Sequence, residues 1–88
     1  MTITIYSKPN CPFCTKAKAL AEMNKDVSEV VYLMLGEDFD AKEFMEKFPQ
    51  ARTFPQIVVS ATKIGGYVQF EEFLNNAEAI RKIVNVGE

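Results

Sequence analysis

The hydrophobic positions in the first half of the chain change from strand-like to helix-like spacing and back. Residues 2–6 alternate between apolar and polar side chains and are rich in β-branched types, which predicts a strand. A helix is predicted from Pro12 to about Asn24, because Pro is favoured at the first helical position. Its apolar face is predicted to hold Phe13, Ala17, Leu20 and Ala21. The nearly unbroken apolar run over residues 30–35 predicts a strand covered on both faces.

The second half of the chain continues with a helix, two short strands and a last helix. Asp40 is a suitable cap for a helix that ends at Pro49. The apolar stripe of this helix is predicted to be Ala41, Phe44, Met45 and Phe48. Residues 57–59 predict a strand, and residues 63–65 its short hairpin partner. Apolar residues at positions 70, 73, 74, 77, 80 and 84 predict the last helix, with a break near residues 75–76 left open.

The resulting order, β-α-β-α-β-β-α, defines an α/β fold. The first strand–helix–strand unit should give a parallel pair with a right-handed crossover. The last two strands have a short connection and should therefore pair antiparallel. We expect a single domain over residues 1–88, built on a mixed four-stranded sheet with helices on both faces.

Charge and hydropathy exclude several classes of protein. The formal net charge of −2 argues against a nucleic-acid-binding protein, which usually carries a basic face. No apolar run approaches the roughly 20 residues of a membrane span. The start of the chain, MTITIYSKPN, lacks the basic and apolar segments of a secretory signal. We therefore expect a protein of the reducing cytoplasm, without a nucleic-acid or membrane partner.

The chain has two cysteines, Cys11 and Cys14, and no histidine. The pair could form a structural disulfide, half of a metal site or a reactive dithiol. A closed zinc site needs four ligands, usually Cys or His, and a structural disulfide is rare in a reducing cytosol. A C-x-x-C pair at a strand-to-helix junction favours the redox dithiol. Cys11 at the helix N-cap should have a lowered thiol pKa and act as nucleophile, with Lys8 adding positive charge and Cys14 as the resolving thiol.

Two later segments, RTFPQIVV and KIGGY, suggest how a substrate could be held. If the bond before Pro55 is cis, the backbone of Phe54 could pair with a peptide-like substrate as a short antiparallel strand. The N–H groups that follow Gly65–Gly66 could hold a carboxylate. Taken alone, each segment fits a plain strand start or turn equally well.

The motifs YSKPNCPFC, RTFPQIVV and IGGY, in this order and spacing, resemble the glutaredoxin family over nearly the whole chain. The resemblance implies a thioredoxin fold and glutathione-dependent reduction of disulfides, with glutathione as co-substrate and no permanently bound cofactor. It implies that Cys11 is the glutathionylated nucleophile and Cys14 the resolving thiol. It also implies a cis Pro55. The implied glutathione-binding residues are Lys8, Phe13, Thr53, Phe54, Pro55, Gly66, Tyr67 and Val68.

This sequence departs from the family pattern at two places. Val68–Gln69 stands where acidic residues often follow the glycine pair, so no side chain of Val68 can accept the glutamyl amino group. Phe54 replaces the usual Val, and we expect its bulk to lie beside the substrate groove. Lys47 or Arg52 could supply a second contact to a glutathione carboxylate.

The resemblance implies glutathionylated or disulfide-containing protein partners, with ribonucleotide reductase as one candidate, and a monomer. Two alternatives stay open. One is a thioredoxin-like reductant recharged by a flavoprotein, against which the short chain and the CPFC motif count. The other is a dimeric carrier that bridges a [2Fe–2S] cluster through Cys11 and glutathione, against which Pro12 counts.

Overall fold

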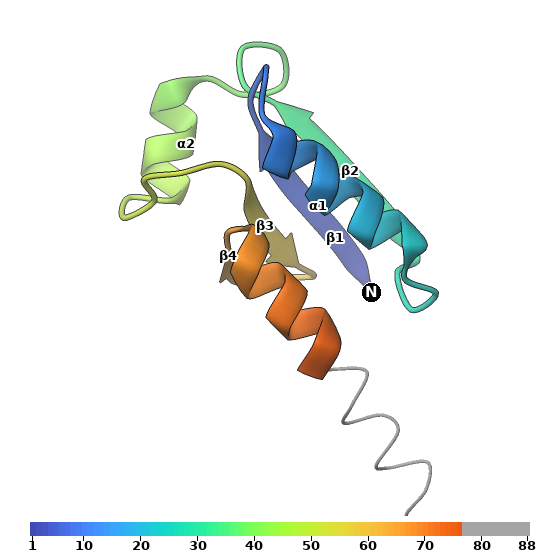
Figure 1. Cartoon of the computed structure of the whole chain (residues 1–88). Coiled ribbons are helices and arrows are strands. Elements are labelled where there is room, and N and C mark those ends of the chain that lie inside the picture. The colour runs from blue at the N-terminus through green and yellow to red at the C-terminus, as the bar shows by residue number, and fades with distance from the viewer. Residues whose placement is uncertain (77–88) are drawn as a thin grey trace, which may run out of the picture.

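The computed structural model describes residues 1–76 as a sheet with helices on both faces (Figure 1). The elements are β1 (Thr2–Ser7), α1 (Pro12–Met23), β2 (Glu29–Met34), α2 (Ala41–Lys47), β3 (Gln56–Val59) and β4 (Thr62–Gly65). A third helix then runs unbroken from residue 67 through residue 76. This order confirms the predicted one. The predicted apolar positions 77, 80 and 84 lie outside the described residues.

The sheet has the strand order β2-β1-β3-β4. β1 pairs in parallel with β2 and antiparallel with β3, and β3 pairs antiparallel with β4. The mixed four-stranded sheet is thereby confirmed. The expectation that residues 30–35 are covered on both faces was wrong, because β2 lies at an edge and its residues 30–34 are only half-buried. The strand that is buried at every position is β3, which lies inside the sheet.

Alternate residues of the central strands face two separate hydrophobic clusters. One cluster lies under α1 and the third helix, which share one face of the sheet (Figure 1); it contains Ile3, Ile5, Ala17, Ala21, Ile57, Val59, Phe70 and Leu74. The other, which we call the α2 cluster, contains Phe39, Phe44, Phe48 and Val58, with Tyr6 and Phe54 packed against it. Opposite faces of the sheet are therefore covered by different helices, as predicted.

Two aromatic or long side chains predicted to be buried are exposed. Phe13 is 52% exposed and Met45 is 50% exposed. In α1 the predicted Ala17 and Ala21 are buried together with Cys14, and their small side chains let the helix lie close to the sheet. Phe13 precedes Cys14 by one residue, about 100° around the helix, and so points away from the sheet. No helix within residues 1–76 is long and apolar enough to cross a membrane.

Candidate active site

The two cysteines lie at the start of α1 and are joined by a disulfide. Their sulfur atoms are 2.21 Å apart and their Cα atoms 5.2 Å apart. Cys11 has extended backbone angles and is the N-cap of the helix, while Pro12 occupies its first position. The N–H of Cys14 donates to Cys11 Sγ at 3.2 Å and to the Cys11 carbonyl at 3.1 Å. The predicted N-cap is therefore confirmed, and the cap is the sulfur atom itself.

The two sulfur-bearing residues differ in their access to solvent. Cys14 is 0% exposed and belongs to the buried face of α1, whereas Cys11 is partly exposed. An incoming thiol or disulfide therefore reaches Cys11 first. This difference is the one that a nucleophile and a resolving thiol require.

Cys11 borders a surface hollow of about 470 Å³, which we call the Cys11 hollow. Its lining consists of Lys8, Pro9, Asn10, Cys11, Pro12, Thr15, Tyr32 and Met34. Lys8 is exposed and lines this hollow, so a cation lies beside Cys11. Asn10 has φ 57°, a left-handed conformation that Asn tolerates better than most residues. The turn that precedes Cys11 therefore has a residue, Asn10, that tolerates its backbone conformation.

A second hollow, of about 660 Å³, lies between the end of α2 and the start of the third helix; we call it the Arg52 hollow. Its lining consists of Phe48, Pro49, Gln50, Ala51, Arg52, Thr53, Gln56, Lys63, Ile64, Gly65, Gly66 and Gln69. Of the predicted binding residues, Thr53 and Gly66 line it. The Phe54–Pro55 bond is cis, as predicted. A Cβ added to Gly66 would stand 3.6 Å from the Pro55 carbonyl oxygen, so these two predicted segments lie side by side.

Gln69 organises the glycine turn, a role that the sequence analysis missed. The Gly66 N–H donates to Gln69 Oε1 at 3.0 Å, and the Phe70 N–H donates to the Gly66 carbonyl at 3.0 Å. Gly66 is thus the N-cap of the third helix, and Gln69 supplies the returning half of a capping box. The signal was present in the sequence, because a Gln three residues after a cap residue is typical of this arrangement. Gly65, with φ 120°, has a conformation that favours glycine.

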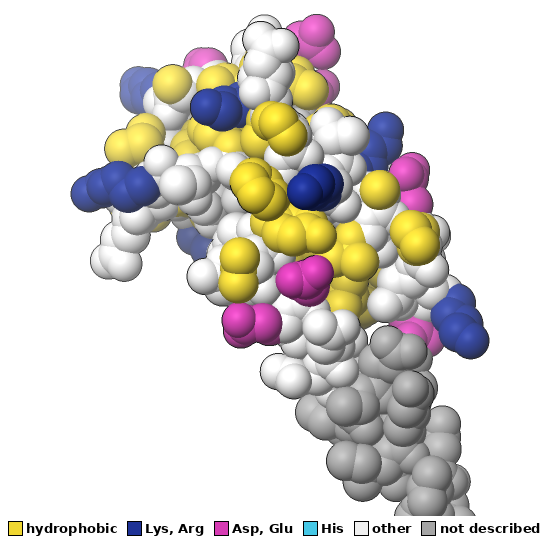
Figure 2. Space-filling view, viewed as in Figure 1, with side chains coloured by type: hydrophobic (Ala, Val, Ile, Leu, Met, Phe, Trp, Pro, Cys, Tyr) yellow, Lys and Arg dark blue, Asp and Glu magenta, His cyan; other side chains and the backbone are white. Residues whose placement is uncertain are grey.

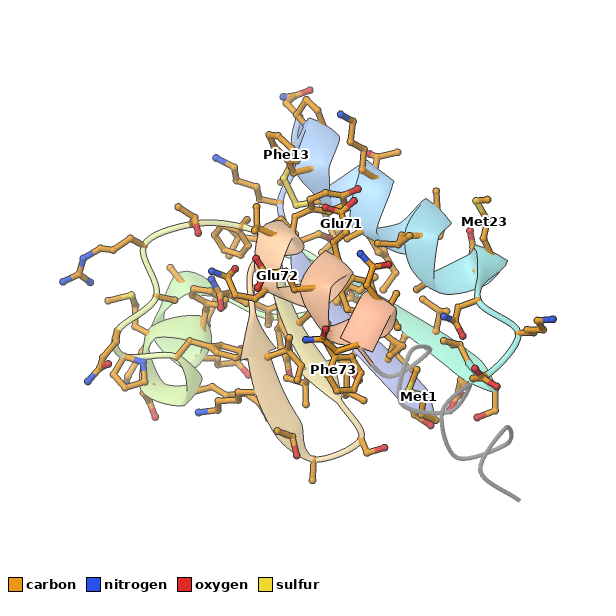
Figure 3. All side chains as sticks on the ribbon, turned by 60° about the horizontal axis from the view of Figure 1, so that its bottom comes forward. Met1, Phe13, Met23, Glu71, Glu72 and Phe73 are labelled. Atoms are coloured by element: carbon orange, nitrogen blue, oxygen red, sulfur yellow. A yellow bond between two sulfur atoms is a disulfide. The ribbon has the colours of Figure 1, made fainter. Side chains whose placement is uncertain are left out.

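Two predicted aromatic residues meet between the helices. The rings of Phe13 and Tyr67 have centroids 5.5 Å apart, and Lys16 Nζ lies 5.1 Å from the Phe13 ring centroid. Figure 3 shows Phe13 at the end of α1 that carries the disulfide. Figure 2 shows hydrophobic side chains gathered where α1 approaches the third helix. Val68 is also exposed. The active cysteines therefore sit beside an aromatic surface, and not beside a purely polar one.

The side chain of Phe54 does not lie in the Arg52 hollow. Its ring stacks on Phe44 with centroids 4.5 Å apart and lies 6.4 Å from that of Phe39, so it packs into the α2 cluster. This packing argues against the expectation that its bulk lies beside the substrate groove. Lys47 Nζ lies 5.7 Å from the Tyr6 ring centroid, also on the α2 side of the sheet. Of the two cations considered for a second carboxylate, Arg52 lines the hollow, and so does Lys63, which the sequence analysis did not single out.

The fold and the site together define a thioredoxin-like thiol–disulfide protein. The defining features are a C-x-x-C pair at the start of the helix after the first strand, and a cis proline before the strand paired with β1. Within residues 1–76 no group of three or more His, Cys, Asp or Glu side chains is placed to hold a metal ion.

Comparison with known proteins identifies the family within this class. The Glutaredoxin family model matches residues 3–64. Glutaredoxin 1 of Rickettsia felis is 34% identical over 65 residues, which are 74% of this chain and 64% of that protein. Glutaredoxin-1 of Sus scrofa is 24% identical over 89 residues, covering 97% of this chain and 84% of the relative. The structure of reduced Escherichia coli glutaredoxin is similar with a TM-score of 0.71 and 29% identity, over 86% of this chain and 95% of that one. The chain belongs to the glutaredoxin family, whose members are thiol–disulfide oxidoreductases.

Proposed function

We propose that this chain is a glutathione-dependent thiol–disulfide oxidoreductase that reduces glutathione mixed disulfides and protein disulfides. The observation that carries the proposal is the asymmetry of the cysteine pair. Cys11 is partly exposed at a helix N-terminus beside a hollow that contains Lys8, and Cys14 is buried behind it. In the reduced protein, the helix dipole and the Cys14 N–H should stabilise a Cys11 thiolate and lower its pKa.

The first chemical step is attack by the Cys11 thiolate on the glutathione sulfur of a mixed disulfide. The new bond joins Cys11 to glutathione, the old disulfide bond breaks, and the electron pair leaves with the protein thiolate. In the second step, a second glutathione thiolate attacks the bound glutathione sulfur. Oxidised glutathione is released and the Cys11 thiolate is regenerated, so no resident cofactor is needed.

A protein disulfide takes a different second step, in which Cys14 acts. The Cys11 thiolate forms a mixed disulfide with one substrate sulfur, and the thiolate of Cys14 then attacks Cys11 Sγ. The substrate leaves as a dithiol, and the cysteine pair is left in the disulfide form that the structure shows. Two glutathione molecules reduce this disulfide again. Ribonucleotide reductase, which is re-reduced as a protein disulfide, is a candidate substrate for this route.

Glutathione binding is proposed to use both sides of the cysteine pair. Lys8 would meet one carboxylate, the backbone of Phe54 before Pro55 would pair with the cysteinyl unit, and Thr53 would flank it. Gly66, Tyr67 and Val68 would lie against the γ-glutamyl end, with Phe13 covering the bound sulfur. Support comes from the placement of these segments: Gly66 lies against Pro55, and Phe13 contacts Tyr67. Because turnover needs a reduced glutathione pool, we propose the cytoplasm as the compartment, with the protein acting as a monomer.

Two single substitutions test the proposal in a coupled assay with glutathione, glutathione reductase and NADPH. Cys11→Ser should abolish turnover of a glutathionylated peptide and of a protein disulfide. Cys14→Ser should keep the first activity and lose the second, because only the second needs a resolving thiol. Full activity of Cys11→Ser would contradict the proposal. Faster turnover with a flavoprotein thioredoxin reductase than with glutathione would favour the thioredoxin-like alternative instead.

A further inference from the structure

We infer that this chain recognises its low-molecular-weight thiol through carboxylates and not through the amino group. The substrate class is then a cysteinyl thiol whose acyl arm ends in a carboxylate, with or without an amino group beside it. This inference deepens the proposed function and rests on it. The determining position is Gln69.

The first observation is the charge of the Arg52 hollow. Its charged lining residues are Arg52 and Lys63, both basic, and no acidic residue lines it. Lys63 Nζ donates to the Lys47 carbonyl and lies 5.1 Å from the centroid of the Phe48 ring, which holds this cation at the wall of the hollow. A carboxylate that enters the hollow therefore meets two cations, whereas an ammonium meets two like charges.

The second observation is the state of Gln69, the lining residue from the third helix. Its side-chain oxygen already accepts the Gly66 N–H at 3.0 Å. The amide is neutral: its oxygen keeps a second lone pair but carries no charge, and its NH₂ only donates. The neighbouring Val68 is apolar and exposed. The glycine turn therefore presents donors, a neutral amide oxygen and apolar surface to a ligand, and no negative charge.

Glutathione carries two carboxylates and one ammonium at neutral pH. An exposed ion pair contributes a factor of about 1.4 to 5 to binding, and this factor requires a carboxylate within reach. In the Arg52 hollow the ammonium would stay in solvent beside two cations. Removing it therefore costs no ion pair and lowers the repulsion.

Two carboxylates follow Gln69 on the third helix, and one of them, Glu72, provides the control. Glu71 and Glu72 are exposed, and neither lines the hollow. Figure 3 labels both, on the helix whose first turn contains Gln69. Glu72 lies three residues after Gln69 and so on the same face of the helix. It is therefore the acidic residue best placed to contact the ammonium group in place of position 69.

The test compares two reporter peptides, one joined through its cysteine to glutathione and the other to glutaryl-Cys-Gly, which lacks only the amino group. Reduced protein carrying Cys14→Ser is mixed with each, and release of the fluorescent peptide gives a second-order rate constant. The step balances without another thiol, because Cys11 gains the small thiol and the peptide leaves as a thiolate. Rates with dithiothreitol correct for the intrinsic reactivity of each disulfide. The same measurement is made with Gln69→Glu and with Glu72→Gln added.

We expect the corrected rates of the two peptides to agree within about twofold in the parent protein and with Glu72→Gln. Gln69→Glu keeps an oxygen for the Gly66 N–H and adds a charge, so it should create a preference for the glutathione peptide of about two- to fivefold that falls with added salt. A parent preference for the glutathione peptide above about twofold would overturn the inference, and its loss with Glu72→Gln would assign the contact to Glu72. A Gln69→Glu protein without a preference would overturn the role of position 69. If neither peptide reacts faster with the protein than with dithiothreitol, the proposed function fails.

Discussion

Replacing Phe54 by Val, the residue more usual in the family, tests where its side chain acts. In this chain the ring is half-buried, stacks on Phe44 with centroids 4.5 Å apart and lies 6.4 Å from the Phe39 ring. Phe54→Val should therefore destabilise the fold and leave the reaction almost unchanged. The opposite result is expected if the ring lies beside the substrate.

The magnitude follows from the burial and the ring contacts. Val has four fewer carbons than Phe, and at about 0.8 kcal/mol per buried CH₂, halved for partial burial, the lost burial is about 1.6 kcal/mol. Losing the stacking on Phe44 adds about 0.5–1 kcal/mol. We expect the free energy of unfolding to fall by about 2 kcal/mol, a large share of the roughly 5–15 kcal/mol of a typical domain.

Urea denaturation of the disulfide form measures this change. With a slope of about 1 kcal/mol per molar urea for a domain of this size, the midpoint should fall by about 2 M. The rate constant for a glutathionylated peptide, without urea, should stay within about threefold of the parent value, because the proposed substrate contact of Phe54 is its backbone. Phe13→Val is the matched control: its ring is exposed, so we expect a loss below about 1 kcal/mol.

The reasoning would be refuted by a midpoint shift below about 0.5 M together with a large fall in rate. That pair of results would place the ring in the groove and not in the α2 cluster. A loss of stability as large for Phe13→Val as for Phe54→Val would equally contradict the distinction drawn between the two rings.

Three further predictions concern the helices. Asp40→Ala removes the side chain that accepts the Glu43 N–H at 2.8 Å, and should cost about 1–2 kcal/mol in urea denaturation; a change below about 0.3 kcal/mol would show that this capping box does not stabilise α2. Phe44→Ala should cost about 3–5 kcal/mol and its neighbour Met45→Ala less than about 1 kcal/mol, and equal costs would contradict the assigned faces of the helix. Ultraviolet titration of the reduced protein should give Cys11 a thiol pKa below the usual value of about 8.5. The reduced fold should then gain stability as pH rises from the pKa of the folded protein to that of the unfolded chain. A pKa at or above about 8.5 would contradict activation by the helix terminus.

The element order could be predicted from the sequence because each element has a local signal. Alternation marks β1, Pro12 marks the start of α1, and Asp40 marks the start of α2. The positions of Phe13 and Met45 could not be decided in this way, because helical spacing gives a stripe whose edges depend on how the helix lies on the sheet. The exposure of β2 depends on the strand order, which is set by long-range pairing.

The candidate site was predictable where a covalent or conformational requirement fixes the residue. Cys11 as N-cap and the cis bond before Pro55 are of this kind. The convergence of Arg52 and Lys63 on one hollow could not be predicted, because these residues come from a loop and from β4 and meet only in the folded chain. The direction of the Phe54 ring was missed because it depends on the aromatic cluster that α2 presents.

The cap of α1 couples the chemistry of the Cys11 sulfur to a backbone hydrogen bond. Cys11 Sγ is both the atom that exchanges partners and the acceptor for the Cys14 N–H. Disulfide, mixed disulfide and free thiolate differ in charge and direction as acceptors, so each state presents that N–H with a different hydrogen bond. The Cys14 amide, which belongs to a buried residue, should therefore change its hydrogen bond with the oxidation state of Cys11, so its NMR chemical shift would report that state.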